Sequence, residues 1–196
     1  YTYGQNKIDY VTSDTINSSF ANSLRYTSTL TADEIRSTVP REATAYGLEL
    51  ALQTINLDYT ASYDALELAI GAEMRSDWYT VNAGDEYSYR DYDTEAGQSL
   101  YATDRSAGTQ GFGGIGPLSE VDETRDVISF YIDMETELND NVIINGAIRY
   151  DDYEGFGDST NFKLAANWSI TDDFSLRSAV STGFRAPSMQ QLYFNN

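Results

Sequence analysis

The sequence contains no cysteine and no histidine among its 196 residues. Without cysteine there is no disulfide framework and no thiolate chemistry. Without histidine the commonest general base and metal ligand is missing, which excludes Ser-His and Cys-His mechanisms. We therefore expect no catalytic residues, no metal site and no cofactor.

Basic residues are also scarce, with 12 lysines and arginines against 31 acidic residues and a formal net charge of −19. This balance argues against a nucleic-acid partner, because nucleic-acid binders need basic patches to neutralise phosphates. No apolar run reaches the roughly 18 residues that a membrane-spanning helix requires. The acidic charge is compatible with a cationic ligand or metal, but a solvated acidic surface is the favoured explanation.

What the sequence does contain is alternation of apolar and polar residues, which places side chains on opposite faces of a strand. In residues 161–170, for example, Phe162, Leu164 and Trp168 alternate with Lys163 and Asn167. The same period recurs along most of the chain and predicts seven strands. Their ranges are about 3–11, 46–59, 65–80, 125–138, 142–153, 159–170 and 174–185.

The predicted connections differ in length from one end of the sheet to the other. Tight turns rich in Asp and Asn fall at residues 60–64, 139–141 and 171–173. The long loops 12–45 and 81–123, and one short Gly-rich link at 154–158, fall at the opposite end. A soluble meander has no reason to segregate its connections in this way.

Two architectures explain the pattern, a soluble β-sandwich and a transmembrane β-barrel. The predicted strands run to about 10–13 residues, longer than the usual 5–6 of globular sheets and suited to a tilted membrane crossing. Full charges such as Glu73 and Arg149 stand in mid-strand on the polar face, and aromatics such as Trp168 and Phe174 flank the turns. These features favour an all-β antiparallel meander of about seven long strands, part of a large transmembrane β-barrel.

The long loop 81–123 is the richest candidate for ligand contact. Aromatic rings and guanidinium groups beside carboxylates suit sugar stacking or the binding of a ferric or cationic chelate. The alternative is a solvated loop that packs only on itself. The candidate ligand-binding residues are Tyr87, Tyr89, Arg90, Tyr92, Tyr101, Arg105 and Phe112.

The late part of the sequence, "GAIRYDDYEGFGDSTNFKLAANWSITDDFSLRSAVSTGFRAPSMQQLYF", carries a resemblance to a known family. It combines an R-Y-x-x-Y-x-x-F-G hairpin at 149–157 with S-x-G-F-R-A-P-S at 181–188. Upstream, "KIDYVTSDTINSSF" and "ALELAIGAEMRSDWYTVNAGDEYSY" are similar to earlier strands of the same family. Together these segments resemble the barrel region of a TonB-dependent outer-membrane receptor.

This resemblance implies an active transporter in the bacterial outer membrane that imports a scarce nutrient with energy transduced through TonB. The ligand would be a siderophore, a B12-like chelate or an oligosaccharide. Such receptors close about 22 strands around an N-terminal plug, so we expect this chain to be an excerpt of a longer protein, with the plug absent. The implied partners are outer-membrane lipid, the plug domain of the same full-length chain, the TonB complex through its N-terminal part, and the nutrient.

In that orientation the tight turns would face the periplasm, and the long loops would face outwards and meet the ligand. Strand phase then assigns a set of charged side chains to the lumen, where they would contact the plug or line the ligand path. These residues are Glu73, Arg75, Asp133, Arg149, Arg177 and Arg185. A soluble or surface carbohydrate-binding module is the alternative function. A glycosidase is a more distant one, because no carboxylate pair is placed by the sequence.

Overall fold

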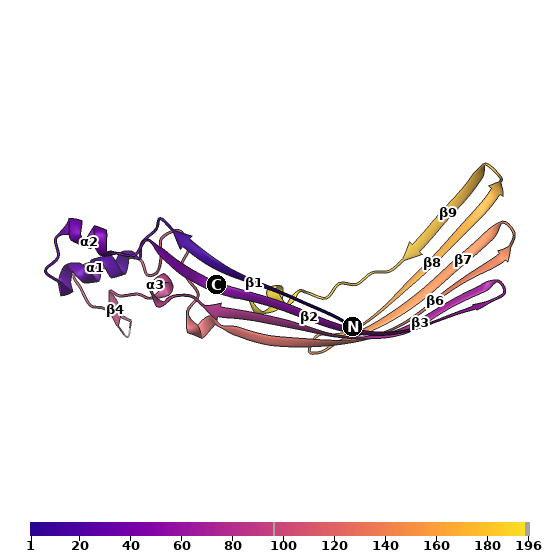
Figure 1. Ribbon diagram of the computed structural model, residues 1–196, viewed down its shortest axis with the longest axis horizontal. Helices are drawn as coiled ribbons and strands as arrows, with labels where there is room; N and C mark the ends of the chain where they lie inside the picture. Colours follow the sequence, from indigo (N-terminus) through magenta and orange to yellow (C-terminus); the bar gives the residue numbers. More distant parts are fainter. Residues whose placement is uncertain (96, 195–196) are drawn as a thin grey trace. The chain divides into compact units, whose positions relative to one another are not determined.

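A computed structural model describes residues 1–95 and 97–194. Its main feature is a seven-stranded sheet with strand order β1-β2-β3-β6-β7-β8-β9, in which successive strands of the sheet lie side by side (Figure 1), while β4 and β5 pair with each other in a separate sheet. The predicted all-β antiparallel meander is therefore confirmed. The strands are β1 (Thr2–Ser13), β2 (Glu42–Tyr63), β3 (Leu66–Ala83), β6 (Val121–Asn139), β7 (Val142–Tyr153), β8 (Gly157–Thr171) and β9 (Phe174–Ser181).

The segments expected to be long loops contain regular structure of their own. Residues 12–45 hold helices α1 (Ser18–Thr27) and α2 (Ala32–Thr38), and residues 81–123 hold short elements. Ala96, within the second expected loop, lies outside the described residues. The short elements are α3 (Glu86–Tyr89), β4 (Thr94–Glu95), β5 (Gln98–Ser99) and a 3-10 turn (Pro117–Ser119), and α4 (Met189–Tyr193) follows β9.

The chain forms two compact units. One, here called the strand unit, comprises Tyr1–Gly4, Ala51–Asp77 and Thr124–Met189. The other, here called the loop unit, comprises Gln5–Leu50, Trp78–Glu123 and the residues from Gln190 onwards.

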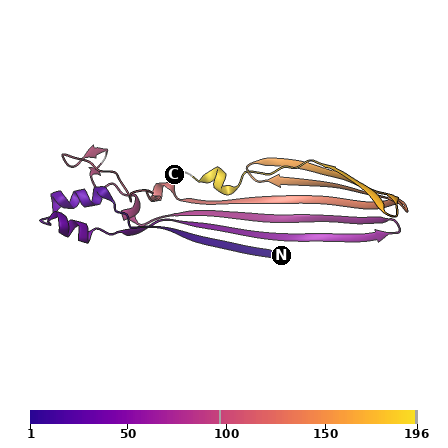
Figure 2. The same ribbon diagram turned by 90° about the horizontal axis from the view of Figure 1, so that it is seen from above.

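In the strand unit, β6 to β9 lie side by side in a continuous antiparallel ladder (Figures 1 and 2). Ile132 pairs with Ile148, which pairs with Phe162, and one residue further along Asp133 pairs with Ala147 and then Lys163. Because directly paired residues share a face, the ladder gathers the apolar side chains on one side and the polar side chains on the other.

Short polar connections join these strands. Asp64 begins the two-residue β2–β3 link with φ of 44°, a left-handed conformation that aspartate tolerates better than most residues. In the β7–β8 link Gly155 has φ of 70°, and Gly157, the first residue of β8, has φ of 119°, both of which glycine adopts without strain. β9 ends at Ser181, four residues before the predicted end, as the chain moves towards Pro187, which has no N–H to donate to a ladder.

In the loop unit the two longer helices lie side by side (Figures 1 and 2). The Asn17 side chain caps α1 by accepting a hydrogen bond from the Phe20 N–H, and Thr31 forms a capping box with Glu34 at the start of α2. The apolar core of this unit consists of Ile35, Val39, Ala43, Ala45, Tyr46, Leu48, Tyr79, Val81 and Ile115.

Candidate functional site

The apolar face of the strand unit is exposed over several adjacent strands. Phe162 and Leu164 of β8 are 50% and 53% exposed, and Trp168 of the same strand is 48% exposed. An apolar surface this continuous is costly in water and marks contact with another apolar phase. Its further members on β6 to β9 are Ile128, Phe130, Ile132, Met134, Ile148, Ile170, Phe174, Leu176 and Val180.

The opposite face carries a chain of charged and hydrogen-bonded groups across three strands. Arg149 of β7 donates from Nη2 to Glu73 of β3 at 2.9 Å and from Nε to Asp151 at 2.8 Å. The same Asp151 oxygen accepts a hydrogen bond from the Ser129 hydroxyl of β6 at 2.6 Å. Two of the predicted lumen residues, Glu73 and Arg149, are thus brought together in one ion pair.

A second charged cluster on this face centres on Asp77, which lies between two arginines. Arg75 Nε is 3.2 Å from one carboxylate oxygen, and Arg125 Nη2 donates to the other at 3.0 Å. Arg125 also donates to the Pro187 carbonyl at 2.8 Å and lies 5.7 Å from the centre of the Tyr153 ring. This arginine, only 8% exposed, was missed by the sequence analysis, although it shares the strand phase of Ser129 and its neighbours.

The remaining predicted lumen residues form no ion pair with these clusters among the described residues, although Asp133 lines one hollow with Arg149. Asp133 accepts a hydrogen bond from the Asn145 amide at 2.8 Å. Arg177 lines an open hollow of about 490 Å³ together with Glu135 and Lys163. Arg185 is exposed and follows the end of β9, so strand alternation does not determine the direction of its side chain.

In the loop unit, most of the predicted ligand-binding aromatics hold the two long connections together. The Tyr87 hydroxyl accepts from the Asn17 N–H at 2.8 Å and donates to the Pro40 carbonyl at 2.8 Å. Burial raises the pKa of the Tyr87 phenol, which keeps the hydroxyl protonated and able to donate. The buried Asn17 side chain donates in turn to the carbonyls of Tyr87 and Arg90, at 2.9 Å and 2.8 Å.

Aromatic pairs extend this packing. Tyr92 meets Phe20 of α1 edge-to-face at 4.9 Å, and Tyr101 stacks on Tyr26 of α1 at 4.6 Å. Burial raises the pKa of the Tyr92 phenol, so this ring stays neutral. The rings of Tyr92 and Tyr101 therefore stabilise the loop unit through contacts within the chain.

The other candidates also have partners in the loop unit. Arg90 pairs with Glu86 one turn away and lies 4.9 Å from the centre of the Tyr92 ring. The Tyr89 ring covers Gly116, where a Cβ atom would stand 3.1 Å from the ring. Phe112 lies 5.9 Å from the Tyr46 ring.

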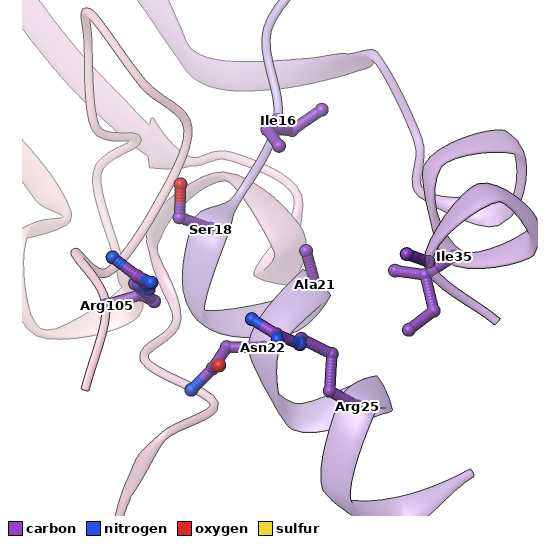
Figure 3. A pocket seen from close by; sticks show the side chains of 8 residues that line it. Ile16, Ser18, Ala21, Asn22, Arg25, Ile35 and Arg105 are labelled. Carbon is purple, nitrogen blue, oxygen red and sulfur yellow. The ribbon is translucent and has the colours of Figure 1, made fainter. Parts of the chain in front are cut away.

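Arg105 differs from the other six, because it lines a pocket of about 400 Å³ (Figure 3). The wall of this pocket comes mainly from α1, α2 and Ile16, which lies two residues before α1. No candidate residue was predicted in this segment. The available sequence signal for a binding site in this segment was Arg25, the one basic residue of positions 18–27. The lining residues are Ile16, Ser18, Ala21, Asn22, Arg25, Ala32, Ile35 and Arg105.

None of the helices at 1–95 or 97–194 is both long and apolar enough to cross a membrane. Over the same residues, no group of three or more acidic side chains is gathered so that it could hold a metal ion.

The profile of the TonB dependent receptor-like, beta-barrel family matches residues 1–196. The chain belongs to the TonB-dependent receptor family. No solved structure matches the chain. Membership implies nutrient transport at the outer membrane and a transporter or receptor rather than an enzyme.

For a TonB-dependent receptor barrel, the two faces of the strand unit have a direct physical explanation. The strands of outer-membrane barrels alternate apolar residues towards lipid with polar residues towards the lumen. The exposed Phe162 and Leu164 fit the lipid side, and the Glu73–Arg149 pair fits the lumen side. Family membership therefore supports the outer-membrane interpretation over a soluble carbohydrate-binding module.

Proposed function

We propose that this chain forms part of an outer-membrane active transporter that binds a scarce nutrient and imports it with TonB-transduced energy. The observation that carries the proposal is the exposed apolar face of β6 to β9 opposite a charged face in the same strands. A sheet that buried one face in a soluble core would hide its apolar side chains, whereas a barrel wall presents them to lipid.

The long connections face the outside of the cell in this proposal, and the tight turns at residues 139–141 and 171–173 face the periplasm. Two features support a ligand-collecting role for the loop unit. It has an apolar core of its own and an internal hydrogen-bond network around Asn17, and it contains a pocket. Such a preformed surface binds at lower entropic cost than a mobile loop.

The charged face of the strand unit meets the plug or lines the ligand path in this proposal. Its groups are partly satisfied within the sheet, as in the Arg149 contacts with Glu73 and Asp151. Arg177 and Lys163 border a hollow with an acidic group, Glu135, on the same wall. A plug surface with complementary charges would therefore find both donors and acceptors there.

Uptake in living cells tests this proposal. Cells lacking the gene for this receptor, and separately cells lacking TonB, are compared with wild-type cells for uptake of labelled siderophores, B12-type chelates and oligosaccharides. We expect both deletions to abolish high-affinity uptake of the same nutrient, with recovery when the receptor gene is restored. Uptake of every tested nutrient at the wild-type rate in cells lacking the receptor gene would contradict the proposal.

A further inference from the structure

The pocket in the loop unit lies against one side of α1, with α2 and Arg105 completing its wall (Figure 3). Its volume of about 400 Å³ is in the range of small-molecule sites, about 300–1,000 Å³. Ile16 and Ile35 supply apolar surface, and the Ser18 hydroxyl, the Asn22 amide and two guanidinium groups supply polar surface. None of the lining residues is acidic.

The two guanidinium groups are Arg25 of α1 and Arg105 of the other long connection. Within residues 1–95 and 97–194, neither forms an ion pair with a carboxylate, whereas Arg36, Arg41 and Arg90 of the same unit do. Arg25 lies in the last turn of α1, where a cation interacts favourably with the helix dipole. That interaction does not account for Arg105, which reaches the same pocket from a segment 80 residues further along the chain.

Asn22 contributes a buried side chain to the wall of the same pocket. Its side chain is 3% exposed, and its Nδ2 donates to Asp93 Oδ2 at 3.1 Å and to the Thr103 carbonyl at 2.8 Å. These two acceptors fix the orientation of the amide. Among the described residues, Asn22 Oδ1 then has no donor, although buried polar atoms are nearly always hydrogen-bonded.

The backbone N–H of Arg105 is anchored to Asp93, the carboxylate that also holds the Asn22 amide. The Arg105 N–H donates to Asp93 Oδ2 at 2.8 Å, and Asp93 is fully buried. One carboxylate therefore ties Asn22 on α1 to the backbone of Arg105 on the other connection. The Asn22 side chain and the backbone that carries one of the two cations are held in place before any ligand arrives, which reduces the ordering cost of binding.

From this arrangement we infer that the pocket binds a small ligand that carries both an anionic group and hydroxyl groups. Arg25 and Arg105 bind the anionic group, because guanidinium groups match carboxylate oxygens in charge and geometry. Asn22 Oδ1 accepts a hydrogen bond from a ligand hydroxyl, and Ile16 and Ile35 contact its carbon skeleton. Acidic saccharides and hydroxycarboxylates share this chemistry. The inference rests on the proposed function and names the class of ligand.

Binding to the intact receptor, purified in detergent, tests the inference by calorimetry. The probes are digalacturonate, its uncharged methyl ester and citrate, so that the two sources of the chemistry are measured separately. We expect digalacturonate or citrate to bind, and the methyl ester to bind at least about tenfold more weakly than digalacturonate if the saccharide is the ligand. Arg25→Gln and Arg105→Gln should each weaken binding of the charged probe at least about tenfold.

Arg36→Gln is the matched control, because Arg36 lies exposed on α2, pairs with Asp33 at 3.2 Å and does not line the pocket. It should bind the charged probe as the wild type does. Arg25→Lys, which keeps the charge, should retain more affinity than Arg25→Gln. The inference is overturned if neither charged probe binds, or if Arg25→Gln and Arg105→Gln bind as tightly as Arg36→Gln.

The outcome separates this inference from the proposed function. If charged probes bind through the two arginines but cells lacking the receptor import nutrients normally, the proposed function fails and the pocket assignment stands. If the receptor imports an uncharged nutrient and binds neither charged probe, the pocket assignment alone fails.

Discussion

Gly71 of β3 lies where the Tyr131 side chain of β6 crosses the strand. The Tyr131 hydroxyl donates to Asp58 of β2 at 2.8 Å, so the ring passes over Gly71 to reach its partner. A Cβ atom at position 71 would stand 2.3 Å from Tyr131 Cε1 and 2.5 Å from Asp58 Oδ1. Glycine here permits an aromatic side chain to link three strands on the polar face.

We therefore predict that Gly71→Ala destabilises the folded barrel. Displacing the Tyr131 ring breaks its hydrogen bond or strains the strand, at the cost of about 1–3 kcal/mol usual for overpacking. The measurement is the temperature at which the folded receptor band converts to the unfolded band in gel electrophoresis. Gly146→Ala is the matched control, because a Cβ atom at that position of β7 meets nothing within 4 Å. Equal transition temperatures for the two variants would contradict the role assigned to Gly71.

The stability of the start of α2 should depend on pH through Glu34. Its carboxylate accepts hydrogen bonds from the Thr31 hydroxyl and the Thr31 N–H, both at 2.7 Å, and these contacts lower the pKa of Glu34 below its ordinary 4.5. Because the pKa of Glu34 is lower in the folded state, the stabilisation of α2 by the Glu34 carboxylate is fully present at pH values above the pKa of the unfolded state. It is lost as the pH falls through the folded value.

We expect amide exchange at the start of α2, corrected for the intrinsic pH dependence, to accelerate when the pH falls below 4.5, the ordinary Glu value. Glu34→Gln should show faster corrected exchange at neutral pH and no such acceleration, because its side chain does not titrate. An acceleration of the same size in Glu34→Gln would show that another group is responsible.

At the scale of the element, β8 separates its two faces most clearly. Leu164 is exposed on the apolar face, and the adjacent Ala165 lines the hollow on the polar face. An arginine that faces lipid near the middle of a bilayer costs about 2–4 kcal/mol in a barrel. An arginine at position 165 would enter the open hollow of about 490 Å³ that is lined by Glu135, Lys163 and Arg177.

We therefore predict that Leu164→Arg lowers the amount of folded receptor in the outer membrane, whereas Ala165→Arg leaves it close to wild type. The measurement is the folded fraction in isolated outer membranes, by the same gel assay. If Ala165→Arg reduces the folded fraction as strongly as Leu164→Arg, the assignment of the two faces to lipid and lumen is reversed or wrong.

The strands could be predicted from the sequence because their period is local. Phe162, Leu164 and Trp168 alternate with Lys163 and Asn167, and this alternation fixes both the strand and its two faces without further information. The ends were harder to predict. β2 begins at Glu42 and β8 at Gly157, because ladder pairing with neighbouring strands continues into residues whose own pattern is weak.

The candidate site was predicted only in part, because it depends on contacts between distant segments. The sequence drew attention to Tyr87 and Tyr101 as candidate ligand-binding residues, and it did not predict their contacts with Asn17 and Tyr26 of the other connection. Helix α1 escaped prediction because it is short and the side chains that it buries, Ser19, Asn22 and Ser23, are polar. Arg25 therefore had no predicted position next to Arg105.

Across the whole molecule, the two units differ in how they remove apolar side chains from water. The loop unit buries Ile35, Tyr46 and Tyr79 in a core of its own. The strand unit buries few apolar side chains and exposes a continuous apolar face. Lipid is the partner that satisfies such a face without a second protein layer, and the net charge of −19 then belongs to the water-exposed loops, turns and polar face.

The proposed function requires this sheet to span the outer membrane with its long connections outside the cell. Because the chain contains no cysteine, a single introduced thiol reports the location of its segment. Thr29→Cys and Ser106→Cys place exposed thiols in the two long connections, and Asp172→Cys places one in the β8–β9 turn. The unsubstituted receptor supplies the background.

The decisive measurement is labelling of intact cells with a polyethylene-glycol maleimide that is too large to pass through porins. We predict that the thiols at positions 29 and 106 are labelled in intact cells, and that the thiol at position 172 is labelled only after the outer membrane is permeabilised. Labelling at position 172 in intact cells, with positions 29 and 106 protected, would contradict the proposed orientation.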